Sequence, residues 1–200
     1  MAPTKVDPEA VIAFKDAKAF AKWLKASHAK VPELWLKFAK GGSGIASVTY
    51  AEALDEALCW GWIDGQKKAF DEKYWLQRFV PRGKKSIWSK INREHTERLI
   101  GEGRMQSQGQ AQIDAAMADG RWDRAYDGAS KMEIPHDLLA AIEAEPTALE
   151  LFLKLNSQNR FALAFRTHNM KTEAGRKKKI EGFVEMLKRG ETIYPNGKAK

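Results

Sequence analysis

The chain has 200 residues, of which 44% are hydrophobic and 30% are charged. These proportions are typical of a soluble globular protein that buries a core, and they exclude a disordered chain. No apolar run approaches the ~20 residues that a membrane-spanning helix needs, and the first residues do not have the pattern of a secretory signal. We therefore expect a cytoplasmic protein without a membrane span.

The net charge of +8 is unevenly distributed along the chain. Residues 154–200 carry 12 Lys/Arg and 4 Asp/Glu, whereas the charges of residues 1–153 cancel. A basic excess with a defined location attracts anions such as nucleic acids and phosphate compounds. The C-terminal quarter is therefore the first candidate for an anion-binding surface.

The first third of the chain predicts one helix and one strand. Residues 1–12 contain two prolines and are expected to form a flexible arm. Helical spacing of Phe20 and Leu24 predicts a helix over 16–27. Apolar residues alternate over 34–38, which is typical of a strand, and the glycine-rich residues 41–44 are expected to form a flexible loop.

A capping box and a hairpin follow. Thr49 and Glu52 have the spacing in which each side chain bonds to the backbone of the other residue, so a helix is predicted from Thr49 to about Trp60, ended by Gly61. Residues 62–70 and 74–80 then read as two strands joined by a short turn, and Pro81 closes the second strand.

The rest of the chain is predicted to be helical. One helix is predicted from Ser89 through Leu99, and another begins at Ser107. From Pro135 the chain reads as short helices, and the last one begins at Thr172. The fold class is α+β: a small antiparallel sheet of about three strands with helices, followed by an all-helical C-terminal part. The predicted regions are an arm (1–12), an α+β region (13–128), a helical region (129–190) and a tail (191–200).

The segment from Cys59 to Asn92 holds four of the seven tryptophans, interleaved with charged side chains. Such a segment is either an aromatic-walled binding surface or the core of a small sheet whose indoles are tied to carbonyls. Both interpretations stay open. The ligand-binding candidates that it contains are Trp62, Asp64, Lys67, Trp75, Arg82, Trp88 and Asn92.

Three roles are open for the acidic and basic members of this set. Asp64 either forms a turn with Gly65 or pairs with Arg82 and fixes the hairpin. Arg82 alternatively binds an anion, because its planar guanidinium matches carboxylate and phosphate groups. A catalytic Asp64 is the third option, although no histidine, cysteine or second acid lies at a usable spacing.

A second candidate set is Arg176, Lys177, Lys178 and Lys179, at the start of the last predicted helix. Cations there oppose the helix dipole, which favours negative charge at a helix N-terminus. Together with the free backbone amides they are candidates for binding an anion such as a phosphate. The alternative is solvated charge, with Glu173 and Glu181 as local partners.

Other chemistry is not indicated by the sequence. The four histidines do not have metal-ligand spacing, so no metal site is expected. No phosphate-binding loop, nucleophile elbow or dinucleotide fingerprint is present, so no cofactor is expected. Cys59 lies in a helical apolar pattern and is expected to be a buried, inert thiol.

Three blocks of the sequence resemble the YdeI/OmpD-associated family, also called bacteriocin-protection proteins. They are A-L-C-W-G-W-I-D-G (57–65), F-V-P-R with S-I-W-S-K-I-N (79–82 and 86–92), and K-T-E-A-G-R-K-K-K-I-E (171–181). The resemblance implies a role in bacterial tolerance of cationic antimicrobial peptides and bacteriocins. No chemistry is agreed for that family.

We therefore expect a non-enzymatic stress-tolerance protein whose basic face binds nucleic acid or another phosphate compound. One alternative is an enzyme with an uncommon pocket around Asp64, Arg82, Trp88 and Asn92. Another is a protein-interaction module with a protein partner. The basic C-terminal quarter should repel cationic peptides, so their direct capture is disfavoured.

Overall fold

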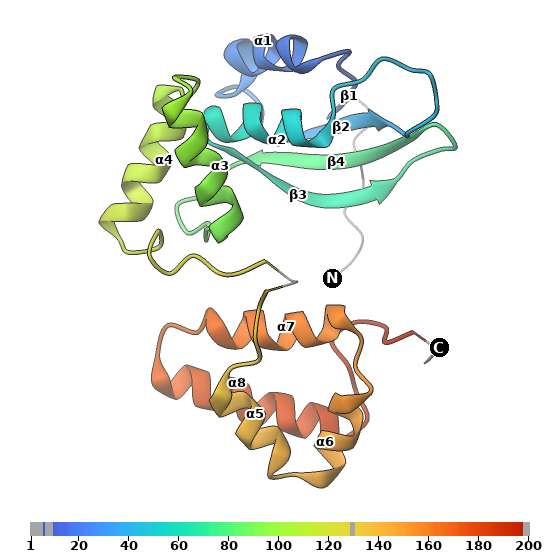
Figure 1. Ribbon diagram of the computed structural model, residues 1–200, viewed down its shortest axis with the longest axis vertical. Helices are drawn as coiled ribbons and strands as arrows, with labels where there is room; N and C mark the ends of the chain where they lie inside the picture. The colour runs from blue at the N-terminus through green and yellow to red at the C-terminus, as the bar shows by residue number, and fades with distance from the viewer. Residues whose placement is uncertain (1–5, 7–9, 129–130, 198–200) are drawn as a thin grey trace. The chain divides into compact units, whose positions relative to one another are not determined.

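The computed structural model describes residues 6, 10–128 and 131–197. The chain divides into two units, Met1–Ala125 and Tyr126–Lys200 (Figure 1). The first unit holds the sheet and four helices, and the second holds helices. An α+β fold with a helical C-terminal part, as predicted, is confirmed.

The sheet of the first unit has four strands in the order β1-β2-β4-β3. The sequence prediction of about three antiparallel strands was therefore wrong by one strand. The additional strand, β1, is the pair Val11–Ile12 in the predicted arm, and it lies parallel to β2 against Trp35 and Leu36. Two residues are too few to show an alternating pattern, so only the long-range pairing defines this strand.

The other three strands pair antiparallel, with β4 in the middle. They are β2 (Leu34–Ala39), β3 (Trp62–Ala69) and β4 (Tyr74–Pro81). The central strand β4 pairs with β2 on one side and with β3 on the other.

The helices of the first unit begin where side chains cap them. They are α1 (Ala17–Ser27), α2 (Tyr50–Cys59), α3 (Lys90–Gly101) and α4 (Ser107–Ala118). Asp16, Thr49 and Ser89 each accept a hydrogen bond from an amide three residues later, and Glu52 completes the predicted capping box. The predicted end of α3 at Leu99 was two residues early, because Gly101 still belongs to the helix.

Two cores hold this unit together. In the first, α1 and α2 pack on one face of the sheet around Phe20, Leu36 and Phe79 (Figure 1). The second joins α2, α3 and α4 around Leu58, Leu99, Ile113 and the rings of Trp88 and Trp122. α4 approaches α2 so closely at Gly109 that a Cβ atom there would lie 2.3 Å from the carbonyl oxygen of Cys59. Cys59 itself is buried, as the apolar pattern predicted.

The second unit consists of α5 (His136–Glu143), α6 (Pro146–Leu153), α7 (Ser157–His168) and α8 (Glu173–Lys188). The buried residues of α8 form an apolar stripe that packs against α5 and α6 around Leu138, Ile142 and Phe152. The stripe consists of Ile180, Phe183, Val184 and Leu187. Within the part of the chain that the structure describes, no helix is long and apolar enough to cross a membrane.

Candidate functional site

Three of the predicted binding residues converge at one end of the sheet face that α2 covers. Asp64 and Lys67 lie on β3 and Trp75 lies on β4. A register shift between Asp64 and Lys67 makes them pair with Phe79 and Gln77, which are two residues apart on β4. Side chains alternate along a strand, so the shift places both residues on the same face.

Tyr50, in the first turn of α2, connects these residues. Its hydroxyl donates a hydrogen bond of 2.7 Å to the Asp64 carboxylate. The Tyr50 and Trp75 ring centroids are 6.2 Å apart, and the Lys67 ammonium lies 4.3 Å from the Trp75 centroid. The Asp64–Arg82 pair, one of the alternatives predicted, is replaced by an Asp64–Tyr50 hydrogen bond, because α2 and not the C-terminal end of β4 supplies the partner of Asp64.

These aromatic rings form a wall of a cavity of about 450 Å³. Trp75 stacks on Phe38 with ring centroids 4.6 Å apart and planes inclined by 17°. Phe38, Tyr50 and Trp75 all line the cavity. We call this cavity the Trp75 cleft. Its remaining lining residues belong to the connection between β2 and α2: Ala39, Lys40, Gly41, Gly42, Ser43, Gly44, Ile45, Ser47, Val48 and Thr49.

The glycine-rich turn of this connection presents polar backbone to the cleft. Gly42 and Gly44 have positive φ values of 79° and 69°, which glycine adopts without strain. A Cβ atom on Gly41, Gly42 or Gly44 would meet nothing within 4 Å. Among the described residues the amides of these three glycines have no acceptor. They are available to an incoming ligand.

The electrostatics at Tyr50 favour binding over proton transfer. Burial, with the adjacent Asp64 carboxylate, raises the pKa of Tyr50 above its usual range. The phenol therefore stays a hydrogen-bond donor at neutral pH and is a poor general base. Among the described residues, no group of three or more His, Cys, Asp or Glu side chains is placed to hold a metal ion.

Arg82 and Trp88 belong instead to the core between α2, α3 and α4. Arg82 is 6% exposed and Trp88 is 2% exposed. The guanidinium carbon lies 3.5 Å from the Trp88 ring centroid, and Nη1 donates to the carbonyl oxygen of Ile87. Trp88 also packs edge-on against Trp122.

Trp62 and Asn92 do not line the Trp75 cleft either. Trp62 is buried in the sheet core, edge-on to Trp23. Asn92 is in the first turn of α3, where its backbone amide donates a hydrogen bond to the Ser89 hydroxyl. Of the predicted set of seven, only Trp75 lines the cleft. Lys67 lies over the Trp75 ring, and Asp64 is bonded to Tyr50.

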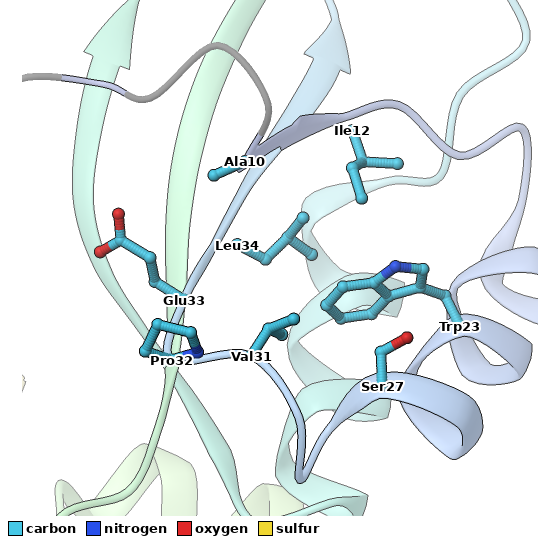
Figure 2. A pocket seen from close by; sticks show the side chains of 8 residues that line it. All are labelled: Ala10, Ile12, Trp23, Ser27, Val31, Pro32, Glu33 and Leu34. Carbon is cyan, nitrogen blue, oxygen red and sulfur yellow. The ribbon is translucent and has the colours of Figure 1, made fainter.

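A second cavity, of about 370 Å³, opens beside α1 (Figure 2). Trp23, Val31 and Leu34 form much of its apolar wall. Glu33 at its edge is paired with Arg78 at 2.5 Å. None of the predicted candidate residues lines this cavity.

The four predicted anion-binding residues on α8 differ in their contacts: Arg176 is bonded to neighbouring helices, whereas the three lysines are exposed. Arg176 donates to both oxygens of Asp137 on α5 and to the carbonyl oxygen of Thr167 on α7. It thereby joins three helices, and its guanidinium lowers the pKa of Asp137. Lys177, Lys178 and Lys179 are exposed, and Lys179 lies 5.8 Å from the ring centroid of Phe183.

Sequence reasoning missed Phe38 and Tyr50 as binding residues. Phe38 was interpreted only as an apolar strand position, and Tyr50 only as part of the capping box. The available signal was the order of glycine-rich turn, cap and Tyr50 directly after a strand that ends in Phe38. Their approach to Trp75 depends on pairing between β2 and β4, which brings Phe38 opposite Trp75.

Two family models match the chain. Residues 12–112 match a domain of unknown function (DUF8412). Residues 131–190 match the family described as "Bacteriocin-protection, YdeI or OmpD-Associated". No curated protein and no solved structure matches the chain.

Proposed function

We propose that this chain is a binding protein whose ligand, held in the Trp75 cleft, is an anionic compound with an aromatic ring. The chain belongs to the DUF8412 family through residues 12–112, and its residues 131–190 match the YdeI/OmpD-associated bacteriocin-protection family. The chemical class is a nucleotide, a nucleic-acid strand or a similar phosphate compound. The protein would contribute to tolerance of bacteriocins by holding this ligand, without catalysing a reaction.

The observation that carries the proposal is the composition of the cleft. Three aromatic residues and a glycine-rich turn line it, and among the described residues the amides of the three glycines have no acceptor. Aromatic rings stack on nucleobases, and backbone amides with positive φ neighbours bind phosphate oxygens. A cavity of about 450 Å³ is within the usual range for small-molecule sites.

Two lysines supply positive charge to the same place. Lys40 lines the cleft and donates to the carbonyl oxygen of Asp71. Lys67 is exposed and lies over Trp75. A solvated ammonium moves at little cost, so Lys67 is free to turn from the ring to a ligand phosphate.

The exposed lysines of α8 would act at longer range. Lys177, Lys178 and Lys179 contribute to the basic excess of residues 154–200. A local excess of positive charge raises the association rate of anions, and salt screens the effect. In this proposal the lysines attract the ligand, and the cleft binds it.

The test is a titration of the full-length chain with AMP, ATP, a short single-stranded DNA, ribose 5-phosphate and inorganic phosphate, followed by calorimetry and thermal shift. A ligand at about 100 times its Kd should raise the unfolding free energy by about 2.7 kcal/mol. Phosphates that carry an aromatic base should bind more tightly than ribose 5-phosphate, because only they stack on Trp75.

Variants assign the binding to the cleft. Replacing Trp75→Ala should weaken AMP binding about tenfold or more, since base–aromatic stacking contributes about 1–3 kcal/mol. Phe70→Ala is the matched control, since Phe70 is an exposed aromatic residue that does not line the cleft, and it should change the affinity little. Equal affinity of wild type and Trp75→Ala for every ligand in the panel would refute the proposed site.

A further inference from the structure

The segment Gly83–Ile91, which we call the Lys–Ile loop, has no part in the Trp75 cleft. It contains most of the conspicuous block S-I-W-S-K-I-N and connects β4 to α3. Ile87 is 40% exposed and Ile91 is 49% exposed. Lys84, Lys85 and Lys90 are exposed beside them. The loop therefore displays branched apolar side chains and cations together.

Two buried arginines bond to the backbone of this loop. Arg82 donates to the carbonyl oxygen of Ile87 at 3.2 Å, and Arg121 donates to that of Ser86 at 2.8 Å. Both arginines are buried. A hydrogen bond from a charged donor is stronger than a neutral one. These two bonds fix the two peptide groups that flank the Cα atom of Ile87.

Further contacts fix the ends of the loop. The Gly83 amide donates to the Ser86 hydroxyl and the Ser86 amide to the Gly83 carbonyl oxygen, which closes a tight turn. Trp88 is buried next to Ile87, and Ser89 caps α3. Because Trp88 occupies the core, the neighbouring Ile87 side chain stays outside. The exposure of Ile87 is thus built into the loop.

The composition of the loop selects its partner. A single exposed isoleucine is ordinary, but two beside three lysines on one short segment are a specific combination. Lysine is depleted in protein–protein interfaces, which disfavours a protein partner. Nucleic acid would use the lysines and leave the isoleucines in water. An anionic lipid surface takes both, with phosphates for the ammonium groups and the acyl boundary for the apolar side chains.

We propose that the Lys–Ile loop docks this protein reversibly on anionic lipid surfaces. The lysines meet the lipid phosphates, and Ile87 and Ile91 enter the boundary between headgroups and acyl chains. Arg82, Trp88 and Arg121 do not touch lipid, and they act as positioning residues that keep the loop in its presented form. This inference is independent of ligand binding in the Trp75 cleft.

Co-sedimentation of the full-length chain with vesicles tests the proposal. Mixed phosphatidylcholine–phosphatidylglycerol vesicles should bind the protein, and phosphatidylcholine vesicles should bind it weakly. Binding should fall as salt rises, because salt screens the lysines. Lys84→Gln/Lys85→Gln should lower the partition coefficient about 25-fold, since each lysine near an anionic surface contributes about fivefold.

The isoleucines distinguish a lipid from other anions. Ile87→Ser/Ile91→Ser should lower vesicle binding about tenfold or more, because the apolar contribution is lost. Ile100→Ser is the matched control, since Ile100 is 43% exposed at the other end of the same helix. Lys18→Gln/Lys22→Gln on α1, where both lysines are exposed, is the control for charge and should lower vesicle binding much less than Lys84→Gln/Lys85→Gln. All four variants change exposed residues, and unfolding curves should overlap with that of the wild type.

Three results would overturn the proposal. The first is equal binding to neutral and anionic vesicles, or to neither. The second is an equal loss in the Ile100→Ser control. The third is binding to a short DNA duplex or to polyglutamate that depends on the lysines, together with no vesicle binding, which would assign the loop to nucleic acid or to an acidic protein. Trp75→Ala should leave vesicle binding unchanged whatever its effect on the cleft.

Discussion

Two cation–aromatic pairs from the same stretch of sequence have opposite surroundings. Lys67 lies 4.3 Å from the Trp75 ring centroid, and Arg82 lies 3.5 Å from that of Trp88. The first pair is at the edge of an open cleft, with Lys67 exposed. The second pair is buried between α2, α3 and α4.

The difference lies in what surrounds the cation. Arg82 gives up water, and its planar group stacks on the indole while Nη1 donates to the Ile87 carbonyl oxygen. Such a contact holds a loop in place. Lys67 stays hydrated, so its contact with Trp75 is weak and easily exchanged for one with a ligand. Similar residue types therefore serve structure in one region and, in our proposal, binding in the other.

The largest expected contrast comes from removing the two indoles. Trp88→Ala should reduce the unfolding free energy by about 3–5 kcal/mol, because it leaves a cavity in a packed core. Trp75→Ala should cost less than about 2 kcal/mol, since Trp75 is only partly buried. Urea unfolding measures both. Equal losses would mean that the two regions do not differ as described.

The two cations should differ next. Arg82→Met removes the donor to the Ile87 carbonyl oxygen and should destabilise the protein by about 1–3 kcal/mol. Lys67→Met should change the unfolding free energy by less than about 0.5 kcal/mol, as is usual at exposed positions. The same urea experiment applies, and a larger effect at Lys67 than at Arg82 would reverse the assignment of roles.

The helix caps beside the two pairs give a smaller and more selective contrast. Thr49→Ala and Ser89→Ala should each cost about 1 kcal/mol, because each removes the oxygen that accepts an amide of the first turn. Only Thr49 lines the Trp75 cleft. Thr49→Ala should therefore also weaken AMP binding, measured by calorimetry, whereas an effect of Ser89→Ala on AMP affinity would contradict the separation of the regions.

The smallest effect is a pH dependence at Tyr50. Burial and Asp64 raise the pKa of Tyr50 in the folded chain above the ordinary value of 10.0. The protonated Tyr50 side chain therefore contributes fully to the free energy of unfolding below that value, and its contribution is lost as the pH rises toward and through the folded-state pKa. As the pH rises above about 10, the wild type should lose more stability than Tyr50→Phe. Parallel stability–pH curves would show that the Tyr50–Asp64 contact does not form in solution.

Several parts of the fold were predicted from local chemistry. Asp16, Thr49 and Ser89 begin helices as predicted, because a cap needs only an amide two or three residues away. The alternation over 34–38 and the stripe of α8 were enough to identify the buried faces of those elements. The third resemblance block, residues 171–181, lies within the residues that match the bacteriocin-protection family, whereas the first two lie within the DUF8412 match.

The candidate site was predicted in part, and the reason is the range of the contacts involved. Asp64, Lys67 and Trp75 were chosen for their residue types, which the sequence shows directly. Their partner Tyr50 is 14 positions from Asp64 and comes from a different element. Without the register of β3 against β4, the residues that share a face cannot be read from the chain.

By itself the sequence determined the helices with their caps, the strands long enough to alternate, and the location of the charge. Those features depend on neighbours within about one helical turn or on the period of a strand. Only the tertiary structure decided that β1 joins β2, that Arg176 pairs with Asp137, and which tryptophans are buried. Each of these depends on residues that are distant in the chain and meet only when the sheet and the helices have packed.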